Sequence, residues 1–186
     1  MGWIVGAGVC RGHLTERAKE LIARAKVVYG SRRALEVAGV LGSGKEKVLK
    51  SFDVDELKRF VEGDAVLLST GDPMVSGLGS MLKDVNVEIE PGISSVQVAL
   101  ARLRVDLSEV AVVDCHARID ESMFELLKFR HLLILADRSF DLSLFGERRV
   151  VILEDLCTRR ETIRSAIAAE AELNSDYAIV FVEGGR

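Results

Sequence analysis

The segment with the most residues suited to ligand binding or catalysis is Ser69–Gly77, with the sequence Ser-Thr-Gly-Asp-Pro-Met-Val-Ser-Gly. Gly71 permits backbone angles that other residues avoid, and Pro73 fixes its own φ and removes one N–H donor. Asp72 lies between them, so its carboxylate is held in a rigid turn and could accept hydrogen bonds from ribose hydroxyls or a ligand ammonium. A turn aspartate that only caps the next helix is common, and this segment alone leaves both interpretations open.

A second candidate is Gly6-Ala7-Gly8-Val9-Cys10-Arg11-Gly12, which directly follows an expected strand. A Gly-x-Gly turn lets the backbone approach a ligand closely. A dinucleotide fingerprint is disfavoured, because the third glycine is at the wrong spacing and the next strand ends without an acidic residue for a ribose. Taken alone, the segment is best interpreted as a plain glycine turn.

A third candidate is Glu90-Pro91-Gly92-Ile93-Ser94-Ser95, which connects an expected strand to an expected helix. Ser94 and Ser95 lie at or near the N-cap, beside free backbone N–H groups that suit polar or anionic ligands. The alternative is that one serine merely caps the helix.

The fourth candidate is Val112–Arg118, which follows a strand in the second half of the chain. His116 and Arg118 could bind a carboxylate, and His116 could move a proton. Cys115 and His116 are adjacent on an extended chain and therefore point to opposite faces, which argues against a thiol nucleophile activated by the histidine.

Composition narrows the class of protein. The chain has 186 residues, 48% of them hydrophobic, and a formal net charge of −4. That balance is typical of a globular protein and provides no broad basic surface for nucleic acid. No apolar run reaches the roughly 18 residues of a membrane span, and Met1–Val5 is too short for a signal peptide. The cysteines are far apart and form no CxxC pair, so no metal site is indicated.

Short apolar runs alternate with amphipathic segments, which predicts an α/β fold of mostly parallel sheets with helices on both faces. The polar stretch Asp106–Glu109 is the best candidate boundary, giving lobes 1–107 and 108–186. We expect strands at Trp3–Ala7, Lys26–Tyr29, Ala65–Ser69, Val85–Ile89, Val110–Asp114, His131–Ala136, Val150–Leu153 and Ala178–Val182, and helices at Leu14–Ala25 (opening near Thr15), Asp53–Val61, Ser94–Arg104, Glu121–Phe129 and Arg159–Glu172.

In order and in spacing, the four candidate segments resemble the tetrapyrrole (corrin/porphyrin) methylases. The resemblance covers nearly the whole chain, with Val9 and Cys10 where the family usually has Pro and Gly. It is carried by Gly6-Ala7-Gly8 with Leu14–Ala18, Gly30 with Arg33 and Leu35, the Gly-Asp-Pro of Ser69–Gly77, Pro91–Gln97, and His116-Ala117-Arg118 in place of His-Gly-Arg.

The resemblance implies two α/β lobes, with S-adenosylmethionine bound in the cleft between them and S-adenosylhomocysteine as product. Pro91–Gln97 is most similar to the subgroup that methylates C5 of cobalt-precorrin-7 to give cobalt-precorrin-8. A homodimer in the cytoplasm is expected, with a separate C15-methylating decarboxylase as functional partner. Neither nucleic acid nor membrane is an expected partner.

Carried over by position, the resemblance assigns roles to individual residues. The donor contacts would be Thr70, Gly71, Asp72, Val75, Ser94 and Ser95, with Ala136 and the region of Leu153 and Glu154 matching less closely. The carboxylate arms of the cobalt-corrinoid substrate would be met by Gly8, Arg11, His13, Arg33 and Arg118, with Arg138 as a further candidate. His116 is the one residue expected to handle a proton.

Several alternatives stay open. Another precorrin methylase of the same fold would share these segments, and a non-catalytic corrinoid-binding module would bind substrate without methyl-donor affinity. Pro91–Gln97 and the short length argue against a diphthine synthase or a ribosomal RNA methylase. An NAD enzyme would require nicotinamide binding.

Overall fold

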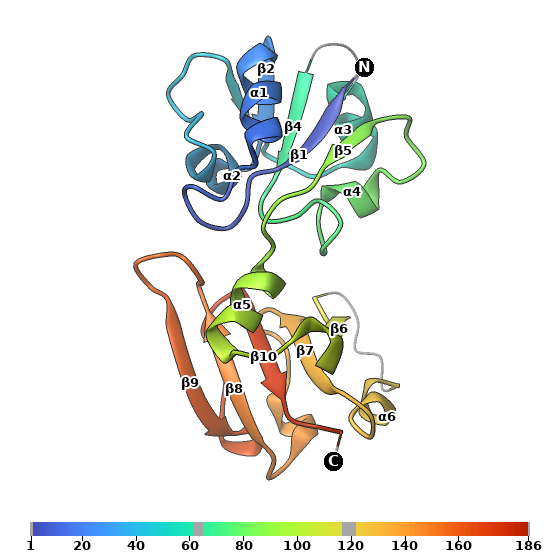
Figure 1. Ribbon diagram of the computed structural model, residues 1–186, viewed down its shortest axis with the longest axis vertical. Helices are drawn as coiled ribbons and strands as arrows, with labels where there is room; N and C mark the ends of the chain where they lie inside the picture. Colours follow the sequence, from blue (N-terminus) through green and yellow to red (C-terminus); the bar gives the residue numbers. More distant parts are fainter. Residues whose placement is uncertain (1, 62–64, 117–121, 186) are drawn as a thin grey trace. The chain divides into compact units, whose positions relative to one another are not determined.

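The computed structural model describes residues 2–61, 65–116 and 122–185. The chain divides into two compact units, Met1–Ser95 and Val96–Arg186 (Figure 1). The division falls in the first turn of helix α5 (Ser95–Leu103), ahead of the polar stretch Asp106–Glu109 where the sequence placed it. Helix α5, expected in the first lobe, therefore belongs to the second unit apart from its first residue.

The first unit is built on a five-stranded sheet in the order β3-β2-β4-β1-β5, with every pairing parallel. Gly6 at the end of β1 pairs with Ser69 at the end of β4, and Val5 pairs with Glu90 at the end of β5. The loops that follow these three strands therefore emerge at one sheet edge. The strands are β1 (Trp3–Gly6), β2 (Val27–Gly30), β3 (Glu46–Val48), β4 (Ala65–Ser69) and β5 (Glu88–Glu90).

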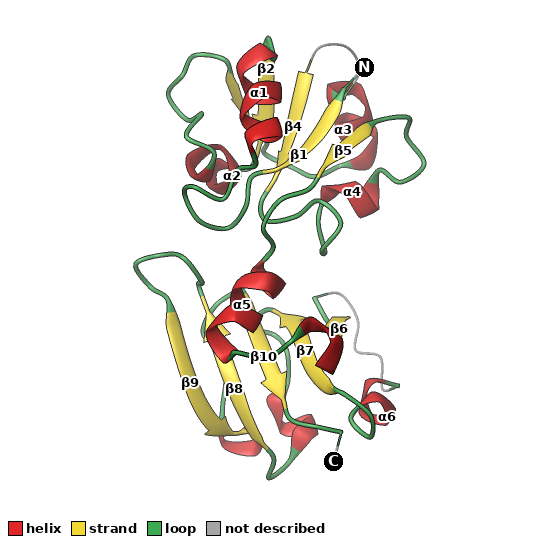
Figure 2. Ribbon diagram, in the orientation of Figure 1, coloured by secondary structure: helices red, strands yellow, loops and turns green. Residues whose placement is uncertain are grey.

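Helices cover both faces of this sheet, as expected (Figure 2). Adjacent strand residues alternate in direction, so Val5 packs with α1 and α2 while Ile4 packs with α3 and α4. Thr15 caps α1 as predicted, its Oγ1 accepting the N–H of Ala18 at 2.9 Å, and Asp53 caps α3. The helices are α1 (Glu16–Arg24), α2 (Arg32–Val37), α3 (Val54–Phe60) and α4 (Leu78–Met81).

The second unit contains a mixed sheet in the order β6-β7-β10-β8-β9. Only β6 and β7 pair in parallel there; the other three pairings are antiparallel. The α/β class is confirmed, and the expectation of mostly parallel pairing holds for the first sheet but is wrong for this one. The strands are β6 (Val110–Asp114), β7 (His131–Ala136), β8 (Arg149–Glu154), β9 (Thr162–Ile167) and β10 (Ala178–Val182).

The helix expected over Arg159–Glu172 is also wrong, and the strand found there accounts for one of the three antiparallel pairings. Thr162–Ile167 forms strand β9, paired along its length with β8 from Arg149↔Ile167 to Glu154↔Thr162. A 3₁₀ turn over Ala168–Glu170 follows it. The β-branched threonine and isoleucines suit an edge strand, and pairing with a neighbouring strand overrides a weak helical pattern.

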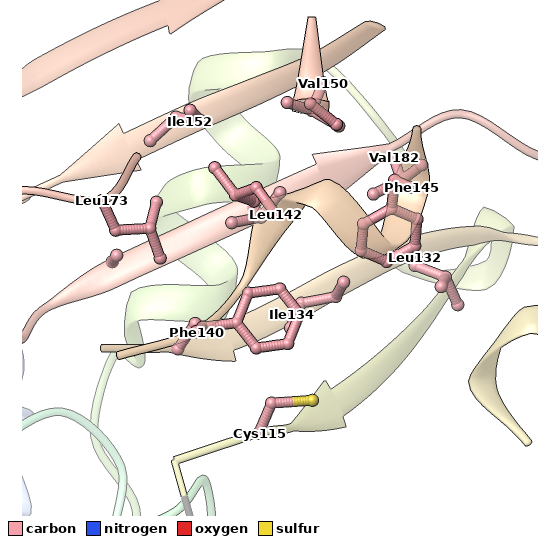
Figure 3. Packing of buried hydrophobic residues seen from close by; sticks show 14 of the residues in the cluster. Cys115, Leu132, Ile134, Phe140, Leu142, Phe145, Val150, Ile152, Leu173 and Val182 are labelled. Carbon is pink, nitrogen blue, oxygen red and sulfur yellow. The ribbon is translucent and has the colours of Figure 1, made fainter. Parts of the chain in front are cut away.

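One face of the second sheet packs on a tight apolar cluster (Figure 3). Leu132 and Ile134 of β7, with Ile152 of β8, meet Phe140 and Leu142 from the connection between those strands. Helix α5 lies over the opposite face (Figure 1). The remaining short elements are the 3₁₀ turns Leu107–Glu109 and Leu142–Phe145 and helix α6 (Met123–Leu126).

Besides β9 and the 3₁₀ turns, the helices and strands not expected from the sequence are β3, α2 and α4. Each spans six residues or fewer, too short to show a helical or strand period. Among the helices of the described residues, none has the length and apolarity to cross a bilayer.

Candidate functional site

The first unit joins two of its candidate loops by backbone hydrogen bonds. Gly8 donates to the carbonyl of Gly71 at 3.1 Å, and Gly71 donates to the carbonyl of Gly8 at 3.0 Å. Both glycines adopt positive φ, +72° and +73°, which other residues reach at a cost. The loop after β1 and the loop after β4 are therefore locked together, and both backbone groups of Gly8, expected to contact substrate, are already engaged.

The loop after β5 packs on the same point through Gly6 and Gly92. A Cβ on Gly92 would lie 2.4 Å from the Gly71 carbonyl oxygen and 2.9 Å from Gly6 Cα. A Cβ on Gly6 would lie 2.5 Å from the Gly92 nitrogen. Only glycine permits three backbones to meet this closely. Gly6, Gly8, Gly71 and Gly92 are hereafter the glycine cluster.

Asp72 ties the same loops together with its side chain. Its Oδ1 accepts the N–H of Met74 at 2.7 Å, and its Oδ2 accepts the N–H of Gly92 at 3.0 Å. The helix-cap interpretation is wrong, because α4 has Gly77 as its N-cap residue. Each carboxylate oxygen already accepts a backbone donor, so Asp72 serves as a strut between the loops after β4 and β5.

Polar groups surround the glycine cluster. Thr70 Oγ1 lies 3.4 Å from the hydroxyl of Ser31, which caps α2. The backbone nitrogen of Ser95 lies 3.9 Å from where a Cβ on Gly71 would stand, and Ser94 is buried beside it. The structure thus brings Thr70, Gly71, Asp72, Ser94 and Ser95 together, with Val75 half-buried in the same loop.

Glu90 is a residue that sequence reasoning missed as a site candidate. Its Oε1 accepts a hydrogen bond from Thr15 Oγ1 at 2.6 Å, which joins the end of β5 to the start of α1. The signal available in the sequence was a charged residue at a strand's carboxyl end, directly before the Pro91-Gly92 turn.

Cations of the first unit gather around a hollow of about 590 Å³. Arg11, Lys19 and Arg32 line it together with Glu36, so the lining carries a net positive charge. Arg33 is half-buried and does not line this hollow. Hollows with converging guanidinium groups suit carboxylate ligands.

His13, another expected substrate contact, has a local structural role. The ring Nδ1 of His13 accepts the backbone N–H of Cys10 at 3.4 Å, and the backbone N–H of His13 donates to the Cys10 carbonyl at 3.2 Å. A Cβ on Gly8 would stand 2.2 Å from His13 Cβ. His13 therefore closes the loop after β1 against Gly8.

In the second unit, His116 follows β6 and is paired with an aspartate. His116 Nδ1 lies 2.7 Å from Asp114 Oδ1, and the same oxygen accepts the backbone N–H of His116 at 3.1 Å. This arrangement orients the ring with Nδ1 as donor and leaves Nε2 as the basic nitrogen. The hydroxyl and N–H of Ser139, with help from His116 and Arg138, lower the pKa of Asp137 at the end of β7.

The other cation candidates of the second unit differ in their surroundings. Arg138 forms a two-pronged ion pair with Asp176, Nε to Oδ1 at 2.5 Å and an NH₂ group to Oδ2 at 2.9 Å. Hydrogen bonding to this carboxylate and its charge raise the pKa of the guanidinium. Arg138 is thus engaged within its own unit. Arg118 lies outside the described residues.

The positions expected to contact the donor from the second unit lie in the interior. Ala136 and Leu153 have fully buried side chains, so only their backbones could meet a ligand. Glu154 Oε1 accepts the N–H groups of Asn174 and Ser175, which ties β8 to the segment before β10.

Comparisons with known proteins show which family and which solved structures the chain is similar to. A sequence model of the tetrapyrrole (corrin/porphyrin) methylases matches residues 3–185. A probable cobalt-precorrin-7 C(5)-methyltransferase from Methanocaldococcus jannaschii is 28% identical, over 98% of this chain and 96% of that protein. The crystal structure of a cobalamin-biosynthesis precorrin-6Y methylase from Archaeoglobus fulgidus is 58% identical, with a TM-score of 0.91 over 99% of this chain and 98% of that one.

A more distant structure adds information on the fold alone. A uroporphyrin-III C-methyltransferase from Thermus thermophilus, solved with S-adenosylhomocysteine, superimposes with a TM-score of 0.74 at 21% identity. The match covers 97% of this chain and 96% of that protein.

Proposed function

Since the chain belongs to the tetrapyrrole (corrin/porphyrin) methylases, we propose that it transfers a methyl group from S-adenosylmethionine to C5 of cobalt-precorrin-7, giving cobalt-precorrin-8. The names of the relatives from Methanocaldococcus jannaschii and Archaeoglobus fulgidus support this reaction. The observation that carries the proposal is the glycine cluster, where three loops meet without side chains at the carboxyl edge of a parallel sheet. Ligands of open α/β sheets bind at such edges.

The groups at this edge fit S-adenosylmethionine. We propose that Thr70, Gly71, Val75, Ser94 and Ser95 contact it through their hydroxyl groups, backbones and half-buried apolar surface. Asp72 holds these loops in place. Backbone N–H groups at the start of α5 favour polar ligand atoms. In the second unit, Ala136 and Leu153 would contribute backbone atoms only.

The substrate's acetate and propionate arms need cationic partners. We propose that Arg11 contacts them from the hollow that it shares with Lys19 and Arg32. Gly8 and His13 shape the loop that carries Arg11. We propose Arg33 and Arg118 as substrate contacts on the resemblance alone. The homodimer, the cytoplasmic location and the separate C15-methylating decarboxylase are proposed on the same ground.

The chemistry needs orientation more than acid–base groups. When bound, the donor supplies an already activated sulfonium methyl and leaves as S-adenosylhomocysteine, so the reaction with a C–H carbon releases one proton. Holding the reacting atoms in line can contribute about 7–11 kcal/mol in favourable cases. The loops locked by the glycine cluster provide that rigidity in the first unit.

We propose that His116 accepts the proton released after transfer. Asp114 orients the imidazole, which leaves Nε2 to act as the base. The substitution His116→Gln is expected to lower kcat by about tenfold to 100-fold, at or below the low end of general-base effects, because water can substitute for the imidazole. S-adenosylhomocysteine affinity should not change. Asp114→Asn, which weakens the orientation only, should lower kcat less; an unchanged kcat in His116→Gln would exclude this role.

The reaction is tested by incubating the protein with cobalt-precorrin-7 and methyl-labelled donor. Mass spectrometry should show the gain of one methyl group, and NMR should place the label on C5. A label on another carbon would identify a different precorrin methylase. A protein that binds the corrinoid, gains no methyl on it and does not bind S-adenosylhomocysteine would be a non-catalytic module.

A further inference from the structure

The loop that carries Arg11 has little packing at its tip. Residues 10–14, hereafter the Arg11 loop, connect the segment after β1 to the N-cap of α1. Arg11 and Gly12 are exposed, Gly12 has a φ of +88°, and a Cβ there would meet nothing within 4 Å. Inside the loop, the hydrogen bonds between Cys10 and His13 close a turn. The position of this turn must therefore be set by the two ends of the loop.

Both ends of the Arg11 loop are fixed by hydrogen bonds. Before the loop, Gly8 is held to Gly71 by two backbone hydrogen bonds. After it, Thr15 Oγ1 accepts the N–H of Ala18 at 2.9 Å and donates its only hydroxyl proton to Glu90 Oε1 at 2.6 Å. A hydroxyl bound this closely to a carboxylate belongs to the stronger class of hydrogen bonds. Thr15 therefore joins the loop both to its own helix and to strand β5.

Glu90 is a fixed anchor for Thr15, because its backbone is held on both sides. Glu90 pairs with Val5 of the neighbouring strand β1. Gly92, two residues further on, donates its N–H to Asp72 Oδ2 at 3.0 Å. Glu90 is half-buried, and its side chain reaches the start of α1. It thereby ties the end of the Arg11 loop to the sheet.

The body of α1 is held independently of this hydrogen bond. Ala18 and Ile22 lie buried in the apolar core of the first unit. Breaking the bond between Thr15 and Glu90 would therefore release the Arg11 loop while the helix keeps its place on the sheet. A loop that loses one of its two anchors gains conformational freedom, and that freedom must be lost again when a ligand binds.

The Arg11 loop forms one side of the hollow of about 590 Å³. Three residues of the loop line this hollow, Arg11 among them, and Lys19 of α1 and Arg32 of α2 supply the other cations. A ligand with several carboxylate arms needs a constant spacing between these cations, because charge-assisted hydrogen bonds depend on geometry. The hydrogen bond to Glu90 fixes the Arg11 loop relative to the other two cations.

We infer that Glu90 is a positioning residue for substrate recognition. Acting through Thr15, it holds the Arg11 loop so that the Arg11 guanidinium meets a carboxylate arm of the tetrapyrrole. This role requires no contact of Glu90 with the substrate or the methyl donor. The inference rests on the proposed function and extends it from residues that bind the substrate to one that places them.

The test measures kinetics with cobalt-precorrin-7 in Glu90→Ala, which removes the acceptor of the Thr15 hydroxyl. KM should rise about tenfold with kcat changed less than about twofold, because substrate and transition state lose the same interaction. Calorimetry should show unchanged S-adenosylhomocysteine affinity. Glu90→Gln keeps an acceptor oxygen and should restore KM to within about threefold of the wild type. The matched control is Glu88→Ala, at an exposed glutamate of the same strand, and its KM should equal that of the wild type.

Thr15→Asp breaks the same hydrogen bond from the other side and keeps the test valid if Glu90→Ala folds poorly. Aspartate is a good N-cap residue and can still accept the N–H of Ala18. An ionised aspartate has no proton to donate to Glu90, and the two carboxylates repel each other. KM should therefore rise at least as far as in Glu90→Ala. Thr15→Ser keeps the hydroxyl and should behave as the wild type.

A double variant separates positioning from a general structural role. Arg11→Ala should by itself raise KM about tenfold or more, because it removes a charged partner of the substrate. Adding Glu90→Ala should raise KM by less than about twofold further, because the loop then carries no guanidinium to misplace. A purely structural effect of Glu90 would instead multiply with that of Arg11.

Three results would overturn the inference while leaving the proposed function intact: an unchanged KM in both Glu90→Ala and Thr15→Asp, effects of Glu90→Ala and Arg11→Ala that multiply, or a rise in KM matched by an equal loss of S-adenosylhomocysteine affinity. Wild-type protein that transfers no methyl group to cobalt-precorrin-7 would instead overturn the proposed function, and the inference with it.

Discussion

Replacing Gly92 by alanine should lower the free energy of unfolding by about 3 kcal/mol, at the upper end of overpacking costs. The new Cβ would stand 2.4 Å from the Gly71 carbonyl oxygen and 2.9 Å from two atoms of Gly6. All of these are backbone atoms, so no side chain can rotate away. The loops after β1, β4 and β5 would have to separate, and S-adenosylhomocysteine affinity should fall with stability. Urea unfolding and calorimetry measure the two effects.

Gly39→Ala is the matched control, because it separates steric overlap from backbone strain. Gly39 has a φ of +70°, yet a Cβ there would meet nothing within 4 Å. Alanine at this position should cost only about 1 kcal/mol, from its left-handed backbone. Its ligand affinity should match the wild type. If Gly92→Ala were no more destabilising than Gly39→Ala, the close approach of the three loops would not be an essential feature of this site.

The first sheet was largely predictable, because its strands are short apolar runs separated by clear helical patterns. Ala65–Ser69 matches β4 at both ends, and the caps Thr15 and Asp53 are where the sequence indicated. Local rules of this kind act within a few residues, so they can be read without knowing the fold. The same rules located the turns that become the glycine cluster.

The second sheet was less predictable, because its pairing depends on distant partners. Thr162–Ile167 becomes a strand only because β8 offers a free edge along its length. Likewise, nothing local distinguishes Gly92, which must be glycine because Gly71 and Gly6 pack against it. The buried Oδ1 of Asp155, which has no hydrogen-bond partner among the described residues, likewise results from three-dimensional burial and has no counterpart in sequence spacing.

The glycine cluster and the Asp72 side chain both hold the loops of the first unit in place, so their loss has related consequences for function. The glycine cluster brings backbones together, and Asp72 fixes their separation by accepting one N–H from each of two loops. A ligand held by backbone donors requires this separation to be constant, since hydrogen bonds weaken within a few tenths of an ångström. Positioning of the methyl donor should therefore be lost when either the glycine cluster or Asp72 is disrupted.

Asp72→Ala should for this reason reduce stability and ligand affinity together. Two charge-assisted hydrogen bonds disappear and the N–H groups of Met74 and Gly92 lose their acceptor, so the free energy of unfolding should fall by about 2–3 kcal/mol. S-adenosylhomocysteine affinity should fall by about tenfold to 100-fold, because the loops that hold it move apart. Urea unfolding, calorimetry and amide exchange at Gly92 measure these effects.

The companion variants show whether Asp72 acts as a strut or as a direct ligand contact. Asp72→Asn keeps one acceptor, while its NH₂ faces the other backbone donor. It should therefore lower the free energy of unfolding by roughly half as much as Asp72→Ala does. Asp84→Asn, at an exposed aspartate of the same unit, should behave as wild type. If Asp72 acts as a strut, S-adenosylhomocysteine affinity and the free energy of unfolding should decrease in proportion across the series, and the Gly92 amide should exchange faster. A direct contact predicts lost affinity with unchanged unfolding and unchanged exchange, which would return Asp72 to the role of ligand acceptor.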